Sequence, residues 1–141
     1  MSISFHNEDT HFDLNQKIRH RNWINKCIVS HSRDPGTISI VFTSNAHLLR
    51  MNREYLNHNY FTDVITFDYT EGNVISGDVF ISIEQVKENA SFYKVLLEVE
   101  LRRVMIHGVL HLMGFNDATE AGKETMREME NEALNLWSKE E

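Results

Sequence analysis

The chain has 141 residues, of which 41% are hydrophobic, 10% are aromatic and one is a proline, a composition that suits one globular domain and excludes disordered and collagen-like classes. Its net charge of −7 argues against a polyanionic partner. Residues 1–60 hold seven Lys and Arg against five Asp and Glu, and residues 61–141 hold seven against sixteen, so contact with nucleic acid is expected mainly from the first half.

The first half of the chain alternates strand-like and helix-like patterns of apolar residues. In chain order they predict a strand at Ile3 and Phe5, a helix over residues 12–30, a strand over residues 37–43 after the turn at residues 34–36, and a helix from Asn45 to about residue 57. Cys27 lies in the first helical pattern, which predicts a buried, unreactive thiol.

The second half begins with two strands, Val64–Tyr69 and Val74–Ile83, joined by a turn at residues 71–73 as in a hairpin. Helices are expected in the rest. Residues 99–113 have almost no polar side and predict a central buried helix, which Gly114 is placed to end. A last amphipathic helix runs to the C-terminus. We therefore expect an α+β fold, in which about five helices pack around a mixed sheet of about four strands.

The chain shows no internal repeat, low-complexity tract or linker, so we expect a single domain over residues 1–141. Its single cysteine cannot form an internal disulfide and suits a reducing compartment. The N-terminal residues lack the features of a signal peptide, and no apolar run approaches the length of a membrane span. These observations predict a cytoplasmic protein with no membrane contact.

The segment MIHGVLHLMGFNDATE, in the central helix and just after it, carries the residues most typical of chemistry. His107 and His111 are four residues apart and therefore lie one turn apart on one helix face, as two ligands of one ion require. Gly114 lets the chain turn back, so that Asp117 can approach them. Two imidazoles and one carboxylate leave a coordination position open for water, as in catalytic zinc sites. We therefore predict one metal ion per chain, zinc by preference, at the end of this helix.

Each expected ligand has a structural alternative. A histidine in an apolar helix is often a hydrogen-bonded core residue, although two at this spacing are costly to bury without a shared partner. Asp117 also begins the sequence Asp-Ala-Thr-Glu, which resembles a capping box before the last helix. Spacing alone leaves the roles of ligand and helix cap open for Asp117.

The segment from His107 to Asp117 resembles the HGxLHLxGYDH signature of the YbeY endoribonucleases. It matches that signature at His107, Gly108, Leu110, His111, Leu112 and Gly114. Residues 51–55 and 62–67 look like the family's LNxxYR and T(D/N)VLSF segments, and residues 77–78 look like its GD strand. The similarity covers roughly residues 40–135.

This resemblance implies a mixed sheet with helices packed about it and a metal-dependent, single-strand-specific endoribonuclease. Its implied roles are maturation of the 3′ end of 16S ribosomal RNA and ribosome quality control. The expected partners are single-stranded or ribosomal RNA and the ribosome or its proteins, with no DNA. A zinc-activated water or a metal-assisted ribose 2′-OH would cut the phosphodiester bond.

The sequence departs from the family pattern at two positions. The family's third histidine falls at Asp117, so the ligands become two histidines and one aspartate, a set also compatible with manganese, nickel or iron. The family's arginine after Tyr55 is Leu56 here. Arg53, one turn before Leu56, and Arg103, one turn before His107, are therefore our candidate catalytic residues for phosphate contact. The alternatives are a solvated position for Arg53 and an ion pair for Arg103.

Asp78 is expected either to support a metal-bound histidine from behind or to serve as a turn residue at a strand end. Other functions are also compatible with parts of the pattern. A metalloprotease of the HExxH type also places two histidines four residues apart, but Gly108 stands where that motif has its general base. An iron oxygenase also uses two histidines and a carboxylate. A non-catalytic ribosome assembly factor, in which the metal only stabilises the fold, is the alternative from a different class.

Overall fold

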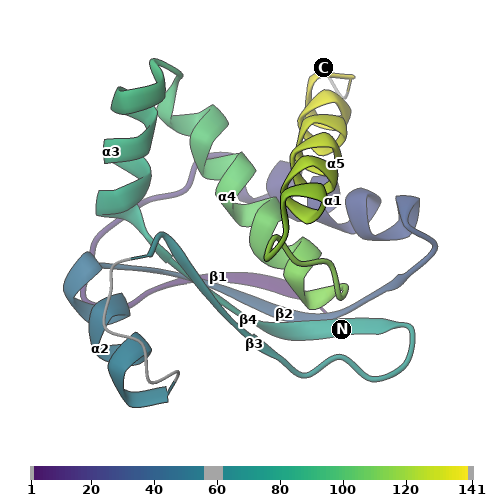
Figure 1. The fold of residues 1–141 in the computed structure, drawn as a ribbon, viewed down its shortest axis with the longest axis horizontal. Coiled ribbons are helices and arrows are strands. Elements are labelled where there is room, and N and C mark those ends of the chain that lie inside the picture. Colours follow the sequence, from purple (N-terminus) through teal and green to yellow (C-terminus); the bar gives the residue numbers. More distant parts are fainter. Residues whose placement is uncertain (1, 56–61, 140–141) are drawn as a thin grey trace.

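Four strands form one mixed sheet in the computed structural model, which describes residues 2–55 and 62–139. The strands, in the spatial order β1-β2-β4-β3, are β1 (Ile3–Asn7), β2 (Asp34–Thr43), β4 (Val74–Ser82) and β3 (Val64–Asp68) (Figure 1). β2 pairs in parallel with both β1 and β4, and β3 pairs antiparallel with β4. The predicted hairpin is therefore confirmed, and it supplies one edge of the sheet.

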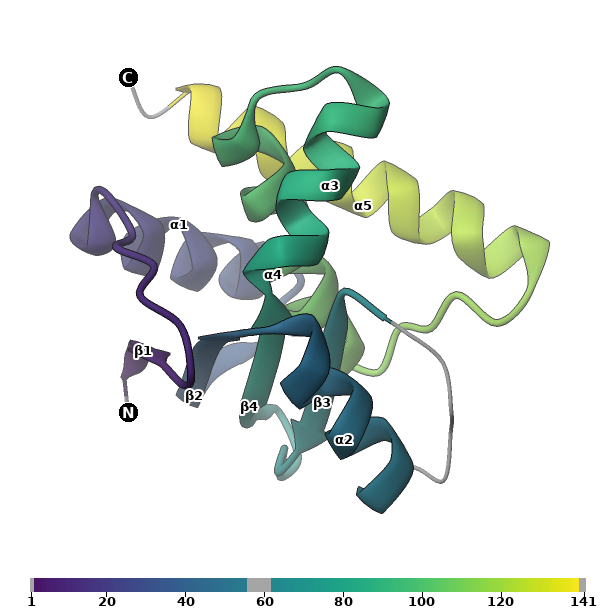
Figure 2. The ribbon, with the colours of Figure 1, turned by 90° about the vertical axis from the view of Figure 1, so that its left-hand side faces the viewer.

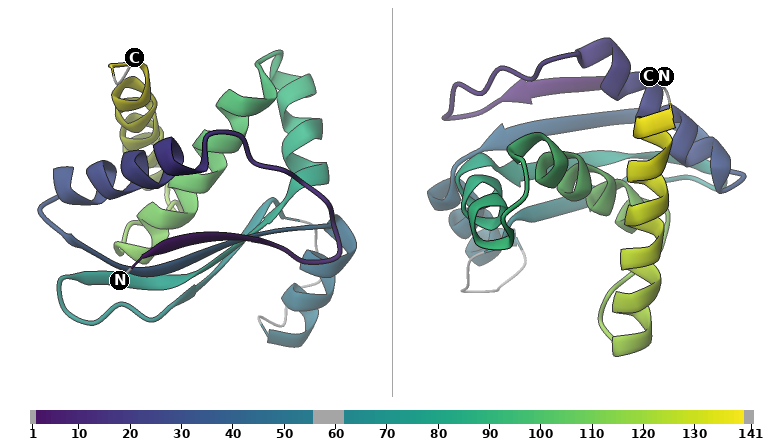
Figure 3. Two further views of the ribbon diagram at one scale, coloured as in Figure 1. Left: turned by 180° about the vertical axis from the view of Figure 1, so that it is seen from behind. Right: turned by 90° about the horizontal axis from the view of Figure 1, so that it is seen from above.

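Five helices cover the two faces of this sheet unequally within the described residues. They are α1 (Lys17–Ser30), α2 (Asn45–Tyr55), α3 (Ile83–Tyr93), α4 (Leu97–Leu112) and α5 (Glu120–Lys139). α4 crosses one face with α1, α3 and α5 on the same side, and α2 packs against the other face (Figures 1 and 3). The predicted α+β class, with its four strands and five helices, is confirmed.

The alternation of side chains along the strands separates the two faces. Val79 on β4 points into the main core beneath α4, whereas its neighbour Phe80 packs beside a small second cluster. That cluster joins Leu48 and Met51 of α2 to Ile65 of β3. α2 thus lies across the sheet from α4. It comes directly after β2 in the chain, as Figure 2 shows.

α4 lies at the centre of the main core, as its almost continuous apolar sequence predicts. Nine of its residues are buried, among them Met105, Ile106 and Val109. Gly108 lets the helix approach the sheet closely, because a Cβ atom at this position would lie 2.6 Å from the Cγ1 atom of Val79. The absence of a side chain at Gly108 therefore sets the spacing between α4 and β4.

The prediction of a helix over residues 12–30 was wrong at its start, because α1 begins at Lys17. Phe12 instead belongs to a loop held by Asn7, whose side-chain amide donates to the Phe12 carbonyl at 2.8 Å and accepts from its N–H at 3.1 Å. The Phe12 ring packs edge-on against Phe42 at 5.0 Å between centroids. Phe12 matches the helical spacing of apolar residues, but it lies in a loop that packs it, partly buried, against the core.

The thiol of Cys27 on α1 is buried, as predicted, and burial raises its pKa to about 12. Such a thiol stays protonated and unreactive near neutral pH. Among the described residues, no helix combines the length and the apolar character needed to cross a membrane.

Candidate metal centre

His107 and His111 lie one turn apart on one face of α4, next to Asp117. Their Nε2 atoms are 3.0 Å apart, and the two rings meet edge to face. Both side chains are partly exposed, at 21% and 26% of their full areas. The helical spacing therefore brings two imidazole nitrogens to one point at the protein surface, as predicted.

Gly114 ends α4 and turns the chain back toward the histidines. Its φ of +96° lies in the region that favours glycine. The N–H of Gly114 donates to the His111 carbonyl at 3.0 Å, and the N–H of Phe115 donates to the Leu110 carbonyl at 3.1 Å. This pair of hydrogen bonds is a Schellman motif, so the prediction of Gly114 as the residue after the helix is confirmed.

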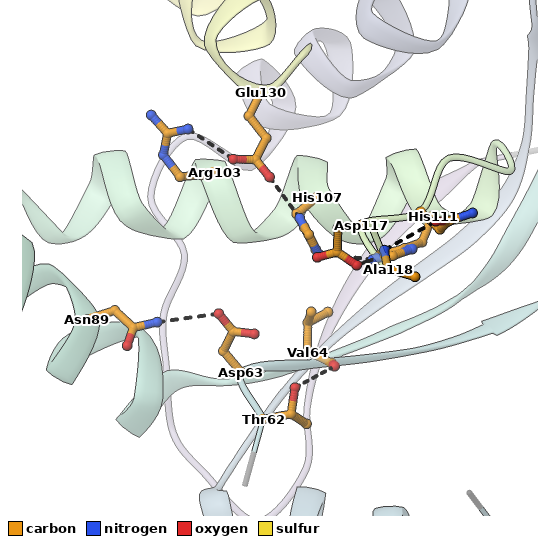
Figure 4. A network of polar contacts seen from close by, with 11 residues as sticks. Thr62, Asp63, Val64, Asn89, Arg103, His107, His111, Asp117, Ala118 and Glu130 are labelled. Atoms are coloured by element: carbon orange, nitrogen blue, oxygen red, sulfur yellow. Dashed lines mark hydrogen bonds and ion pairs between the residues drawn. The ribbon is translucent and has the colours of Figure 1, made fainter. Parts of the chain in front are cut away.

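The returning chain places Asp117 against both histidines (Figure 4). Its Oδ2 atom lies 3.6 Å from Nε2 of His107, and its Oδ1 atom lies 3.8 Å from Nε2 of His111. One ligand atom from each of the three residues falls within 4.8 Å of the other two. We refer to His107, His111 and Asp117 as the metal cluster.

Thr119, rather than Asp117, makes the side-chain contact of a helix cap at the start of α5. The Oγ1 atom of Thr119 accepts a hydrogen bond from the N–H of Gly122 at 3.0 Å, which is the contact of an N-cap residue with the first turn of α5. Gly122 has no Cβ atom, and one there would lie 2.8 Å from the Asn116 carbonyl oxygen. The loop therefore packs tightly on α5 while the Asp117 carboxylate is directed at the histidines.

Glu130 of α5 supports the cluster from the side opposite Asp117. Its Oε2 atom lies 2.7 Å from Nδ1 of His107, and its Oε1 atom accepts a hydrogen bond from Arg103 at 3.0 Å (Figure 4). The Glu130 residue is only 6% exposed. Sequence reasoning missed Glu130, because 23 residues separate it from His107 and other glutamates surround it on α5.

The environment gives the members of the site different proton affinities. Burial alone would lower the pKa of His107, but the hydrogen bond and charge of Glu130, with Asp117 and Asp63, raise it overall. Burial and the charge of His107 lower the pKa of His111. Burial would raise the pKa of Glu130, but its hydrogen bonds from His107 and Arg103 hold that pKa below its usual value. Glu130 is therefore a carboxylate at neutral pH.

The donor set fits a divalent transition metal ion. Imidazole nitrogens and a carboxylate oxygen are ligands that such ions accept, and three protein ligands leave a position for water. A metal-binding histidine commonly hydrogen-bonds a carboxylate through its other nitrogen, as His107 does with Glu130. These residues are thus able to hold one metal ion.

A cleft of about 340 Å³ opens beside the cluster. It is lined by His107, Asp117, Arg103, Glu130, Asp63, Glu100, Arg127, Asn89, Tyr93, Val95, Val99 and Val104. Asp63 comes just before β3, and its Oδ2 atom accepts a hydrogen bond from the Asn89 amide at 3.3 Å. Burial raises the pKa of Asp63 above its ordinary value. The sequence had marked the segment that contains Asp63 but not its place beside the metal cluster.

The other expected site residues lie in different places. Arg103 lines the cleft and forms the ion pair with Glu130 described above. Arg53 is exposed on α2, across the sheet from α4. Asp78 lies on the α2 side as well, where it lines a cavity with Tyr69 and its charge raises the pKa of that tyrosine, and so does not reach the cluster. Leu56, which stands in place of the family's arginine, lies outside the described residues.

The structure also bears on the metalloprotease alternative. The HExxH motif needs its glutamate beside the first histidine, at the position of Gly108. Here that position faces the sheet and is closed by Val79, with 2.6 Å for a Cβ atom. A side chain at residue 108 would therefore clash with Val79, and Gly108 itself supplies no general base.

The fold and the cluster define an α+β protein with a candidate metal centre of two histidines and one carboxylate. The sequence profile of the family described as Endoribonuclease YbeY matches residues 2–138. The Endoribonuclease YbeY of Flavobacterium psychrophilum is 45% identical over 135 residues, or 96% of each chain. That of Parabacteroides distasonis is 43% identical over 140 residues, or 99% of each chain. The chain belongs to the YbeY endoribonuclease family.

A solved structure supports the fold. The solution structure of a Thermotoga maritima protein matches with a TM-score of 0.60 and 23% sequence identity, over 98% of this chain and 93% of that one. At this level of identity the likeness concerns the arrangement of strands and helices. The expectation of a mixed sheet with helices packed about it is thus confirmed.

Proposed function

We propose that this chain is a metal-dependent endoribonuclease that cuts single-stranded RNA in ribosomal RNA processing. The observation that carries the proposal is the gathering of His107, His111 and Asp117 at an open cleft, in a chain of this family. Zinc is the preferred ion, because it favours two imidazoles and one carboxylate with an open position. The whole chain acts as one catalytic domain.

Each residue of the site has a separate task in this proposal. When bound, the ion would supply an activated water molecule and offset charge that develops on the phosphate. The Nε2 atoms of His107 and His111 and the Asp117 carboxylate hold that ion. Asp63 lines the same cleft, and in this proposal its carboxyl group would hydrogen-bond a ribose hydroxyl of the RNA.

The proposed biological role follows the family. The substrate is ribosomal RNA, including the 3′ end of 16S ribosomal RNA, and the work takes place in the cytoplasm, on or near the ribosome and as part of its quality control. Arg53 and Arg103 are proposed phosphate contacts. Arg53 is exposed on α2 and so serves RNA outside the cleft, whereas Arg103 lines the cleft.

A second candidate function, a non-catalytic ribosome assembly factor stabilised by its metal, is favoured by the charge of the cleft. Four carboxylates line the cleft, those of Asp63, Glu100, Asp117 and Glu130, against the two guanidinium groups of Arg103 and Arg127. Without a metal ion, the excess of negative charge in the cleft would repel the phosphate groups of RNA. A divalent metal ion bound to the cluster would cancel this excess negative charge. We therefore keep the endoribonuclease as the proposed function.

Substitution of single ligands tests the function. We expect His107→Ala and Asp117→Ala each to lower the rate of single-stranded RNA cleavage by about 100-fold or more, since each removes a group on which transition-state stabilisation depends. The exposed His6→Ala variant should cleave as the wild type does. All proteins should be purified identically and show the same circular dichroism.

Unchanged cleavage by both ligand variants would assign the activity to a contaminant and leave the assembly-factor function. Analysis of the product ends then separates two mechanisms. A 2′,3′-cyclic phosphate indicates attack by the ribose 2′-OH, and a linear phosphate indicates attack by water.

A further inference from the structure

We propose that Glu130 is a positioning residue that fixes His107 as a metal ligand, and that Arg103 in turn fixes Glu130. The proposal rests on the metal cluster of the proposed function and assigns roles to two residues outside it. These residues form a continuous chain of contacts from Arg103 through Glu130 to His107 (Figure 4).

Glu130 is almost fully buried. A buried carboxylate is costly unless both of its oxygens have partners. Here each oxygen has one, since Oε1 accepts from Arg103 at 3.0 Å and Oε2 meets Nδ1 of His107 at 2.7 Å. The side chain is therefore held in one orientation by two charge-assisted hydrogen bonds.

The contact with Glu130 determines the tautomer of His107. A carboxylate only accepts hydrogen bonds, so Nδ1 of His107 must carry the hydrogen. In the neutral ring, Nε2 is then the nitrogen with a free lone pair, and it points toward His111 and Asp117. Glu130 thus selects the tautomer and the ring orientation that a metal ion needs.

Arg103 contacts two residues of α5. Its Nη1 atom donates to Glu130 at 3.0 Å, and its Nη2 atom donates to the Asn131 side chain, also at 3.0 Å. Both contacts lie on α5, so the guanidinium joins α4 to α5 beside the cluster. Arg103 therefore acts on the metal through Glu130, in addition to any phosphate that it meets in the cleft.

Metal affinity tests the proposal without reliance on RNA cleavage. In a competition with a chromogenic zinc chelator, we expect Glu130→Gln to weaken zinc binding by about 10 to 100-fold, the usual effect of removing such a partner. The matched control is Glu132→Gln, an exposed position on the same helix, which should bind zinc as the wild type does. Arg103→Gln should weaken binding less, and its effect should be largely absent in the Glu130→Gln background.

Nitrogen chemical shifts of the histidine rings test the tautomer directly in the metal-free protein. Wild-type His107 should carry its hydrogen on Nδ1, and Glu130→Gln should show a mixture of tautomers. Wild-type zinc affinity in Glu130→Gln, or a hydrogen on Nε2 alone of wild-type His107 at a pH at which the ring is neutral, would overturn the proposal. A wild-type protein that binds no zinc would instead count against the proposed function, and the ring shifts would still decide the role of Glu130.

Discussion

Histidines in this protein owe their different properties to a few neighbouring groups. His107 has the carboxylates of Glu130 and Asp117 beside it and a raised pKa, whereas burial and the charge of His107 lower the pKa of His111. His20 of α1 is a third case. Its ring packs 4.5 Å from that of Trp137, and burial lowers its pKa despite a hydrogen bond to the Gln16 carbonyl.

The buried His20 gives a prediction for the dependence of stability on pH. Because its pKa is lower in the folded state, the unfolded chain binds a proton first, so acid favours unfolding. The stability that neutral His20 contributes is complete above its unfolded pKa of about 6.5 and is lost as the pH falls through the lowered folded value. The loss has a slope of at most about 1.4 kcal/mol per pH unit.

Urea unfolding between pH 7.5 and pH 5, with a chelator present, measures this effect. His20→Gln should lose less stability over this range than the wild type does. Parallel pH profiles for the two proteins would show that His20 is not the titrating group.

Single residues also show what the sequence can and cannot predict at a site. The pairing of His107 with His111 follows from helical spacing, and the return of Asp117 follows from a glycine at a helix end. Glu130 and Asp63 could not be found in this way. Their approach to His107 depends on how α5 and β3 pack on α4, and no local period encodes that packing.

Different residues of α4 contact the core and the metal cluster. Gly108 and Val109 pack toward the core, while His107 lines the cleft and both His107 and His111 contact Asp117. The strong apolar pattern predicted this helix well, since α4 runs from Leu97 to Leu112. The start of α1 was predicted less well, because a packed loop can bury an apolar residue as well as a helix can.

The close contact between α4 and β4 predicts a change of sign in the effect of one substitution. Gly108→Ala should destabilise the protein by about 1 to 2 kcal/mol, because the clash with Val79 outweighs the gain of about 1 kcal/mol in helix propensity. In a Val79→Ala background the clash is removed, so the same change should stabilise. Urea unfolding of the four proteins gives both values, and equal effects in the two backgrounds would contradict the contact.

At the scale of the whole molecule, α5 joins α1 to α4. The indole N–H of Trp23 on α1 donates to the Ala133 carbonyl on α5 at 2.7 Å. The Trp137 ring has the Arg19 guanidinium 3.7 Å from its centroid and that of Arg102 at 4.2 Å. These cationic groups come from α1 and α4, so one aromatic ring of the last helix contacts both.

This arrangement makes Trp137 a general determinant of stability. Trp137→Ala should lower the free energy of unfolding by about 3 to 5 kcal/mol, the range for removing a buried aromatic side chain. Trp137→Phe should keep part of the packing and lose less. Thermal or urea unfolding measures both variants, and a loss below about 1 kcal/mol for the alanine variant would show that α5 is not needed to hold α1 and α4.

The position of Glu130 late in the chain has a consequence for synthesis. A ribosome that makes this protein completes residues 107–117, with all three proposed metal ligands, before it adds the helix that carries Glu130 and Trp137. A shorter chain that ended after residue 117 would keep the proposed ligands. It would lack the Glu130 carboxylate, which we propose orients His107, and the Trp137 ring, which contacts Arg19 of α1 and Arg102 of α4. If these proposals hold, tight metal binding and RNA cleavage would both require that α5 has been synthesised.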